Sequence, residues 1–174
     1  MSADRRRGAL KKLTVAIGAA LGAALAWPIG RYVAFPASRR TVLGSFEPIV
    51  VAKAAAVVAG QAPLRVIIVA REQRDAWSRA SSVPLGAAWL VRNARGNIQA
   101  FSSACPHLGC AVDYDAQAGV FACPCHQSSF GVGGERLAGP TQRGLDPLDV
   151  IVLDGNVLVR SQRFVAGTAE RKKA

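Results

Sequence analysis

The chain has 174 residues, of which 51% are hydrophobic and 19% are charged. This length suits one compact domain with an appendage, and the apolar content excludes a disordered chain. The net charge of +11 lies at the ends, because residues 1–40 sum to +7, residues 160–174 sum to +4 and residues 41–159 sum to zero. A nucleic-acid-binding domain carries its basic residues on the folded part, so no nucleic acid is expected as a partner.

Residues 1–12 form a basic segment, and the order Arg6-Arg7-Gly8-Ala9-Leu10-Lys11 within it resembles a twin-arginine export signal. The uncharged run over residues 13–30 is long enough to cross most of a bilayer core as a helix. Apolar residues resume after Arg31, so we predict a transmembrane anchor over residues 13–35. The alternative is cleavage after Ala26, which would release a soluble protein.

The basic segment should stay in the cytoplasm, which places the rest of the chain on the other side. The expected location is therefore a bacterial inner (cytoplasmic) membrane, crossed once, with the folded domain on the periplasmic side. Residues 36–48 mix prolines, small residues and charge, and predict a flexible neck.

The remainder predicts an all-β domain over residues 49–162, followed by a basic tail over 163–174. Short apolar or β-branched runs alternate with turn residues, including the pair Asp154-Gly155. The predicted strands cover residues 49–52, 64–70, 88–92, 98–102, 120–122, 148–153 and 156–159. The one further helical pattern covers residues 53–59.

All four cysteines and both histidines lie in two short boxes. Box one, residues 105–110, reads Cys-Pro-His-Leu-Gly-Cys, and box two, residues 123–130, reads Cys-Pro-Cys-His-Gln-Ser-Ser-Phe. Each box contains a Cys/His pair at chelating spacing, namely Cys105 with His107 and Cys123 with His126. One further cysteine in each box is then free to join the two loops as a disulfide.

Two thiolates and two imidazoles suit a [2Fe–2S] cluster with unlike ends. The imidazole-bound iron has fewer negative ligands and is therefore easier to reduce, which raises the potential of the cluster. Two alternatives remain open from spacing alone: a structural Cys₂His₂ zinc site, and a pair of structural disulfides. Zinc would leave the second pair of cysteines without a purpose.

The boxes resemble the C-x-H-L-G-C and C-P-C-H-x-S signature of Rieske iron–sulfur proteins, in the disulfide-bearing form found in cytochrome bc complexes. The similarity runs from about residue 85 to 160 and includes the Gly139-Pro140 loop, which in the family covers the cluster. It implies an all-β Rieske fold of antiparallel sheets with cluster-binding loops at the tip, a single N-terminal transmembrane helix and one [2Fe–2S] cluster.

The resemblance also implies a role for each residue of the boxes. The expected ligands are Cys105 and Cys123 on the inner iron, and His107 and His126 on the solvent-facing iron. The expected disulfide joins Cys110 and Cys125. Ser128 is expected to donate a hydrogen bond to a bridging sulfur, and Leu108 and Pro140 are expected at the docking surface.

Three positions depart from the pattern of the family. Phe130 stands where tyrosine is usual, and the missing hydroxyl predicts a lower reduction potential. Gln127 stands where glycine is common, which is expected to change the loop backbone or its access. The Gly139-Pro140-Thr141-Gln142 loop lacks a second proline, which predicts a less rigid loop.

The implied function is that of the Rieske subunit of a quinol–cytochrome c oxidoreductase, a redox subunit that is not catalytic alone. His126, or less readily His107, would accept a proton from quinol bound to cytochrome b, and the electron would pass to a c-type cytochrome. The expected assembly is a membrane-anchored, dimeric complex. The alternatives are the small subunit of an arsenite-oxidase-like molybdoenzyme and a free-standing membrane or periplasmic electron carrier.

Overall fold

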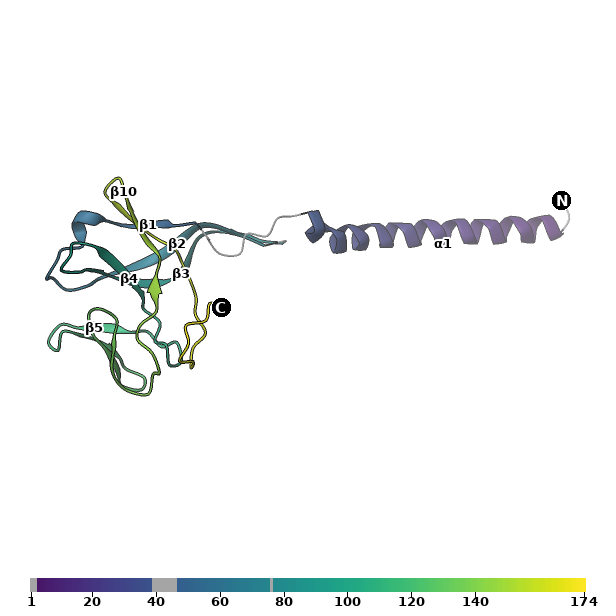
Figure 1. The fold of residues 1–174 in the computed structure, drawn as a ribbon. Coiled ribbons are helices and arrows are strands. Elements are labelled where there is room, and N and C mark those ends of the chain that lie inside the picture. The colour runs from purple at the N-terminus through teal and green to yellow at the C-terminus, as the bar shows by residue number, and fades with distance from the viewer. Residues whose placement is uncertain (1–2, 39–46, 76) are drawn as a thin grey trace. The chain divides into compact units, whose positions relative to one another are not determined.

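The computed structural model describes residues 3–38, 47–75 and 77–174, which Figure 1 traces as a ribbon. The chain divides into two compact units. The first comprises residues 1–41 and 74–78, and the second comprises residues 42–73 and 79–174. We refer to the folded part of the second unit, residues 47–73 and 79–174, as the head.

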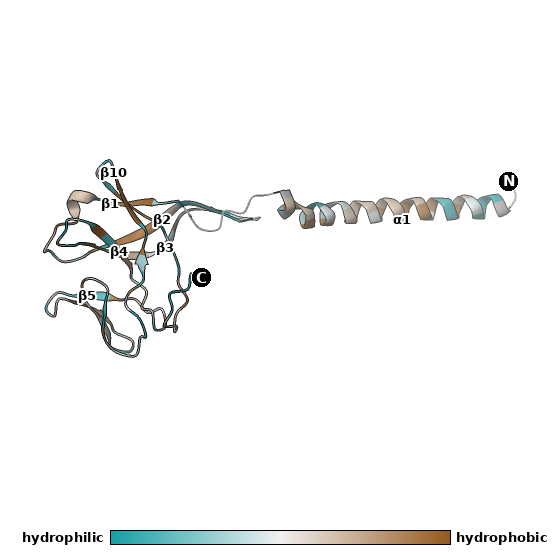
Figure 2. Ribbon diagram, in the orientation of Figure 1, coloured by the Kyte–Doolittle hydropathy of each residue, from teal (hydrophilic) through white to brown (hydrophobic). Residues whose placement is uncertain are grey.

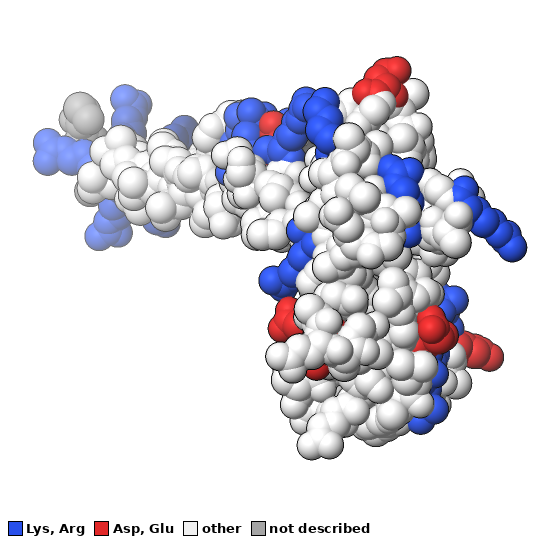
Figure 3. Space-filling view, turned by 90° about the vertical axis from the view of Figure 1, so that its left-hand side faces the viewer, with Lys and Arg blue, Asp and Glu red and all other residues white. Residues whose placement is uncertain are grey.

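The first unit is built on one long helix, α1 (Ala3–Ala34), followed by a 3₁₀ turn, η1 (Phe35–Ser38). The segment Arg5–Ala37, with a mean hydropathy of 1.7, is long and apolar enough to cross a membrane. Figure 2 shows the hydrophilic residues of α1 at its N-terminal end, and Figure 3 shows the Lys and Arg side chains there. The predicted anchor, residues 13–35, lies in this helix except for Phe35, which begins η1, whereas residues 39–46 of the predicted neck lie outside the described residues.

The same unit includes the turn that joins the second and third strands. The Trp77 ring of this turn stacks on Tyr32, with ring centroids 4.2 Å apart, and on Phe35, at 5.5 Å. Asp75 stabilises the turn, because its carboxylate accepts hydrogen bonds from the backbone N–H groups of Trp77 and Ser78. These bonds, the one from Ser78 first, hold the pKa of Asp75 below its ordinary value.

The head consists of three sheets whose resolved strand pairs are antiparallel. The base sheet has the order β1-β11-β10, with β1 (Ile49–Lys53), β11 (Asn156–Val159) and β10 (Val150–Leu153). The middle sheet has the order β2-β3-β4-β9, with β2 (Leu64–Arg74), β3 (Arg79–Arg92), β4 (Ile98–Ser102) and β9 (Pro147–Leu148). The site sheet has the order β5-β6-β7-β8, with β5 (Asp113–Asp115), β6 (Val120–Cys123), β7 (Ser128–Phe130) and β8 (Arg136–Ala138).

The all-β antiparallel prediction is confirmed, with two local corrections. The predicted helix over 53–59 is a single 3₁₀ turn, η2 (Ala54–Ala56). The predicted strand over 148–153 is divided between two sheets, because Leu148 pairs with Ala100 in the middle sheet and Val150 pairs with Val159 in the base sheet. Three short strands of the site sheet, β5, β7 and β8, were not predicted.

Two strands of the middle sheet, β3 and β4, contribute side chains to cores on both faces of the sheet, which follows from the alternation of side chains along a strand. Ala88 and Leu90 of β3 face the core shared with the base sheet. Trp89 and Val91, between and beyond them, face a second core shared with the site sheet. Because β3 and β4 are covered on both faces, they form a rigid support for the loop that follows β4, which is box one.

Trp89 anchors the second core. The indole is 7% exposed, and its Nε1–H donates a hydrogen bond of 2.9 Å to the Val112 carbonyl. The ring packs at 5.4 Å from that of Phe121, at a tilt of 51°. A buried indole needs a partner for its N–H, and here the partner belongs to the segment that leaves box one.

Candidate metal centre

Box one is a closed loop that begins three residues after β4. The Cys105 N–H donates to the Cys110 carbonyl at 2.7 Å, and the Gly109 N–H donates to the Cys105 carbonyl at 2.8 Å. Gly109 has φ +80°, a left-handed conformation that favours glycine. An antiparallel bridge between Ala104 and Ala111 closes the base of the loop. The loop therefore has a fixed backbone.

Box two is the tight connection between β6 and β7, where Cys123 pairs in register with Ser128. Gln127 in this connection has φ +55°, in the left-handed region. Gln127 thus adopts a backbone conformation that favours glycine. The strain of a non-glycine residue in this region is about 1–2 kcal/mol.

The two boxes bring the predicted ligands together in two pairs. Cys105 and Cys123 are 2% and 3% exposed and belong to the same buried core cluster. The rings of His107 and His126 lie edge to face, with centroids 4.8 Å apart. His107 is half-buried and His126 is exposed. The sulfur pair is thus buried, and the imidazole pair reaches the surface.

The predicted disulfide is confirmed: Cys110 and Cys125 are joined, and they lie 15 positions apart in the sequence. The bond links the end of box one to the middle of box two. In the chain-entropy account, closing a loop of this length contributes about 3 kcal/mol to stability. The link also holds the two ligand-bearing loops against each other.

Burial changes the acid–base behaviour of Cys105. Burial, first, and the neighbouring Cys123 thiol raise the pKa of Cys105 above its ordinary value. The protonated form is therefore favoured as long as nothing neutralises a thiolate there. A metal ion replaces that proton, so metal binding at this pair releases protons and depends on pH.

One buried hydroxyl tests which metal group fits. Ser128 is 1% exposed, and its Oγ, which lies near the Cys105 sulfur, makes no hydrogen bond to any described residue. An unpaired buried hydroxyl costs about 1–3 kcal/mol. A [2Fe–2S] cluster would supply a sulfide acceptor for this hydrogen bond beside Cys105, whereas a zinc site would supply no acceptor beyond its own ligand thiolates. Two buried thiols, two imidazoles and this hydroxyl therefore fit a [2Fe–2S] cluster.

The Gly139-Pro140 loop packs directly on this serine. Gly139 has φ +94°, and a Cβ at this position would collide with the Ser128 backbone and hydroxyl. The Arg136 side chain holds the loop, because its Nε donates to the Thr141 carbonyl at 2.6 Å and its Nη2 to the Gly139 carbonyl at 2.7 Å. This clamp stabilises a loop whose single proline predicted less rigidity, and sequence reasoning missed it.

Beyond the loop lies a buried ion pair that the sequence also did not reveal. Arg143 and Asp146 are 7% and 3% exposed. The Arg143 Nε and Nη2 donate to the two carboxylate oxygens of Asp146, each at 2.9 Å. These hydrogen bonds raise the pKa of Arg143 and keep the guanidinium charged. The spacing Arg-x-x-Asp within an apolar stretch is the one signal that pointed to the pair.

The residues predicted to dock are at the surface. Leu108, between the ligand residues of box one, is 63% exposed, and Pro140 is exposed as well. Leu137 on β8 is also exposed, at 50%. Large apolar side chains in contact with water near a site are typical of a surface that meets a partner.

Comparisons with known proteins identify the family. The model of the Rieske [2Fe–2S] domain family matches residues 48–151. The cytochrome b6-f complex iron-sulfur subunit of Chlorobaculum tepidum is 28% identical over 163 residues, which cover 88% of this chain and 74% of that protein. The subunit of the same name from Prochlorococcus marinus is 39% identical over 74 residues, which cover 41% of this chain and 42% of that protein.

Among solved structures, a quaternary ammonium Rieske monooxygenase aligns with a TM-score of 0.50 and 17% identity, over 69% of this chain and 34% of that one. At this identity the likeness concerns the fold alone. A plasma membrane Rieske protein of Synechocystis is 30% identical, over 55% of this chain and 84% of that one, with a TM-score of 0.41. The family match covers more than half of the chain and includes both boxes. The chain therefore belongs to the Rieske [2Fe–2S] family, and its cofactor is a Rieske-type [2Fe–2S] cluster.

Proposed function

We propose that this chain is the Rieske subunit of a membrane-bound, bc-type quinol–cytochrome c oxidoreductase. The observation that carries the proposal is the exposed histidine pair beside the Cys110–Cys125 disulfide, in a chain with one membrane-length helix. The similarity to subunits named for cytochrome b6-f complexes supports it. The chain spans 74% of one such relative and 42% of another, so the activity of the whole complex is part of the proposal.

In this proposal Cys105 and Cys123 would hold one iron of the cluster, and His107 and His126 would hold the other. When bound, the cluster supplies a one-electron carrier whose histidine-bound end is the more easily reduced. The Ser128 hydroxyl donates its hydrogen bond to a bridging sulfur. The two boxes, held by the disulfide, fix the orientation of both imidazoles.

His126 is the residue that meets the quinol, because it is the more exposed of the two histidines. The imidazole nitrogen that does not face iron accepts a hydrogen bond from the quinol hydroxyl and takes up its proton. His107 lies deeper and serves less readily. Leu108 and Pro140, both exposed, border the imidazoles as the apolar surface that docks on cytochrome b and excludes water.

An anchor followed by a neck would let one head reach both cytochrome b and a c-type cytochrome. The helix over 13–35 would remain as the anchor in a bacterial inner membrane after twin-arginine export, with the head on the periplasmic side. The neck over 36–48 would allow the head to move from cytochrome b to a c-type cytochrome of a dimeric complex. Tethering keeps the head at a high local concentration near both partners.

A redox titration of native membranes, followed by EPR at several pH values, tests the redox role. We expect a rhombic Rieske signal, with a potential that falls as the pH rises, because reduction is coupled to proton uptake. Cys105→Ser and His126→Gln should each abolish the signal. A signal that persists in both variants would contradict the proposed ligand set.

Purification of the chain in mild detergent tests the partners. We expect b- and c-type haem to copurify, together with quinol–cytochrome c activity. Copurifying molybdenum would instead support an arsenite-oxidase-like enzyme. A chain that carries the EPR signal but no partner would support a free-standing electron carrier, and either result would overturn the proposal.

A further inference from the structure

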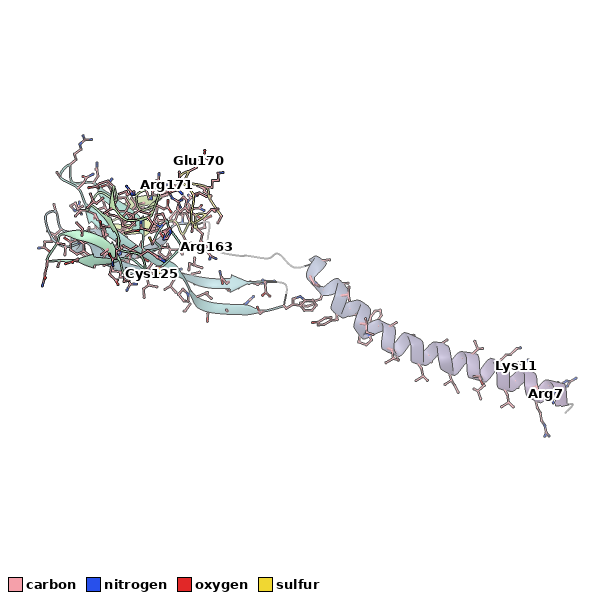
Figure 4. All side chains as sticks on the ribbon, turned by 90° about the horizontal axis from the view of Figure 1, so that it is seen from below. Arg7, Lys11, Cys125, Arg163, Glu170 and Arg171 are labelled. Carbon is pink, nitrogen blue, oxygen red and sulfur yellow. A yellow bond between two sulfur atoms is a disulfide. The ribbon has the colours of Figure 1, made fainter. Side chains whose placement is uncertain are left out.

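The C-terminal residues 163–174, which the sequence predicted as a basic tail, form a hydrogen-bonded hairpin. Phe164 and Lys173 form an antiparallel bridge. The Val165 N–H donates to the Lys172 carbonyl and the Ala174 N–H to the Arg163 carbonyl, both at 2.9 Å. Figure 4 labels Arg163, Glu170 and Arg171 in this segment. We call residues 163–174 the C-terminal hairpin.

The buried ion pair attaches this hairpin to the head. Besides its bonds to Asp146, Arg143 donates to the carbonyls of Val165, at 2.9 Å, and Thr168. Arg171 of the hairpin donates in return to Asp146 Oδ1 at 3.0 Å. A buried guanidinium must have its donors satisfied, and here the hairpin supplies several of the acceptors. Without the hairpin, Arg143 would lose these partners.

The hairpin also contacts box one directly. The Gly167 N–H donates to the Pro106 carbonyl at 2.9 Å. Pro106 lies between Cys105 and His107, so the bond reaches the peptide that connects two ligand residues. Gly167 has φ +72°, and a Cβ there would lie 3.6 Å from the His107 carbonyl, so the two backbones are closely apposed.

Asp146 supports the same loop from its other end. Its backbone carbonyl accepts a hydrogen bond of 2.8 Å from the Ser102 N–H, at the end of β4. Box one begins three residues later. A cleft behind the loop is lined by box-one residues and by hairpin residues, namely Cys105, Pro106, Gly109, Arg163, Phe164 and Ala166. The entry to box one and its Pro106 carbonyl are thus both connected to the Arg143–Asp146 pair.

We propose that the C-terminal hairpin positions box one, with Arg143 as the positioning residue that fastens the hairpin to the head. Hydrogen bonding and solvent exposure around a cluster set its potential, so a loop that shifts should change both the potential and the EPR g-values. This role concerns how the head holds its cluster. It is independent of the identity of the quinol and of the electron acceptor.

The experiment uses the full-length cluster-loaded protein in detergent. One variant ends at Arg163, and a second carries Arg143→Gln with Asp146→Asn, which replaces the buried charges by a neutral pair of similar shape. The matched control is Lys172→Gln with Lys173→Gln. Residues 164–174 carry three cations and one anion, so the control removes the same net charge of +2 as the truncation.

Three readouts are compared: the midpoint potential, the EPR g-values and the hydrogen exchange of a peptide that covers box one. We expect both test variants to shift the potential and the g-values and to speed exchange in box one several-fold. Exchange in the base sheet should not change, and the control should match the wild type in all three.

Two results would overturn the proposal. The first is a truncated chain whose potential, g-values and box-one exchange match those of the wild type. The second is a control that reproduces the shift of the truncated chain, since the effect would then be electrostatic. None of the readouts needs quinol or cytochrome, so failure of the proposed function would leave this test unaffected, and the reverse also holds.

Discussion

Gln127 occupies a backbone conformation that its side chain disfavours. Replacing it with glycine removes about 1–2 kcal/mol of left-handed strain, against about 0.5–1 kcal/mol of added chain entropy in the unfolded state. We therefore expect Gln127→Gly to stabilise the head by up to about 1.5 kcal/mol. Gln127→Val should destabilise it, because a β-branched residue tolerates positive φ least.

Denaturant unfolding followed by circular dichroism measures both changes at Gln127. The control is Gln99→Gly, at an exposed position of β4, where glycine weakens a strand and should lower stability. If Gln127→Gly destabilises the head as much as Gln99→Gly does, the strain argument fails.

Phe130 is fully buried, opposite Phe121 in the β6–β7 register. Restoring the hydroxyl that is usual in the family, with Phe130→Tyr, should raise the reduction potential, because a hydrogen bond to a ligand sulfur stabilises the more negative reduced state. Phe121→Tyr makes the same chemical change in the same core. It should lower stability without raising the potential.

An EPR-monitored titration of both tyrosine variants provides the comparison. Equal potentials for Phe130→Tyr and the wild type would remove the argument that Phe130 lowers the potential, while leaving the cluster assignment intact.

At the scale of elements, the Gly139-Pro140 loop depends on a single side chain. Arg136→Ala removes two hydrogen bonds from a charged donor, each worth about 1.5–3 kcal/mol when buried and less at this partly exposed site. We expect faster hydrogen exchange over residues 136–143 and faster loss of the EPR signal on storage. Arg136→Lys should rescue only part, because an ammonium group cannot reproduce the fork of a guanidinium.

Arg95→Ala serves as the control for the loop variants, since Arg95 lies in an exposed turn between β3 and β4. Exchange over 136–143 that is no faster in Arg136→Ala than in Arg95→Ala would show that the loop is rigid without the clamp.

Long, buried strands could be predicted from the sequence, whereas short strands could not. The base and middle sheets were predictable because runs such as 64–70 and 98–102 alternate or concentrate apolar residues over a sufficient length. β5, β7 and β8 are three residues each and include Asp113, Ser129 and Arg136, so no periodicity develops. These strands form by tertiary pairing around the boxes.

The candidate site divides in the same way. The disulfide was predictable, and a ligand set could be proposed, because Cys and His are rare in this chain and their spacing is specific. The Arg136 clamp and the contacts of the C-terminal hairpin join residues to backbone carbonyls across the fold. Every residue has a backbone carbonyl, so composition and spacing could not indicate which carbonyls accept these hydrogen bonds.

At the scale of the whole molecule, the central question is whether the N-terminal helix is kept as a membrane anchor or removed by cleavage after Ala26. We expect the mature protein to remain in membranes after alkaline carbonate extraction, with an intact mass that still includes the basic segment. Arg6→Lys with Arg7→Lys should block export and leave the protein on the cytoplasmic side, because the twin-arginine pair is the expected address.

Mass spectrometry and protease accessibility in spheroplasts distinguish the outcomes for the anchor. A mass that begins at Trp27, together with recovery in the soluble periplasm, would contradict the retained anchor. Unchanged export of the double Lys variant would contradict the assignment of the signal but not that of the anchor.

The position of Trp89 has a practical consequence. The indole lies in the core that also contains Cys105 and Cys123, hydrogen-bonded to the segment leaving box one. The chain has two other tryptophans, Trp27 and Trp77, both in the first unit. With those two replaced by phenylalanine, the remaining tryptophan fluorescence comes from Trp89 alone, which lies beside the expected site of a light-absorbing cluster. Insertion and loss of the cluster can then be followed continuously in dilute solution, as quenching and recovery of the Trp89 fluorescence.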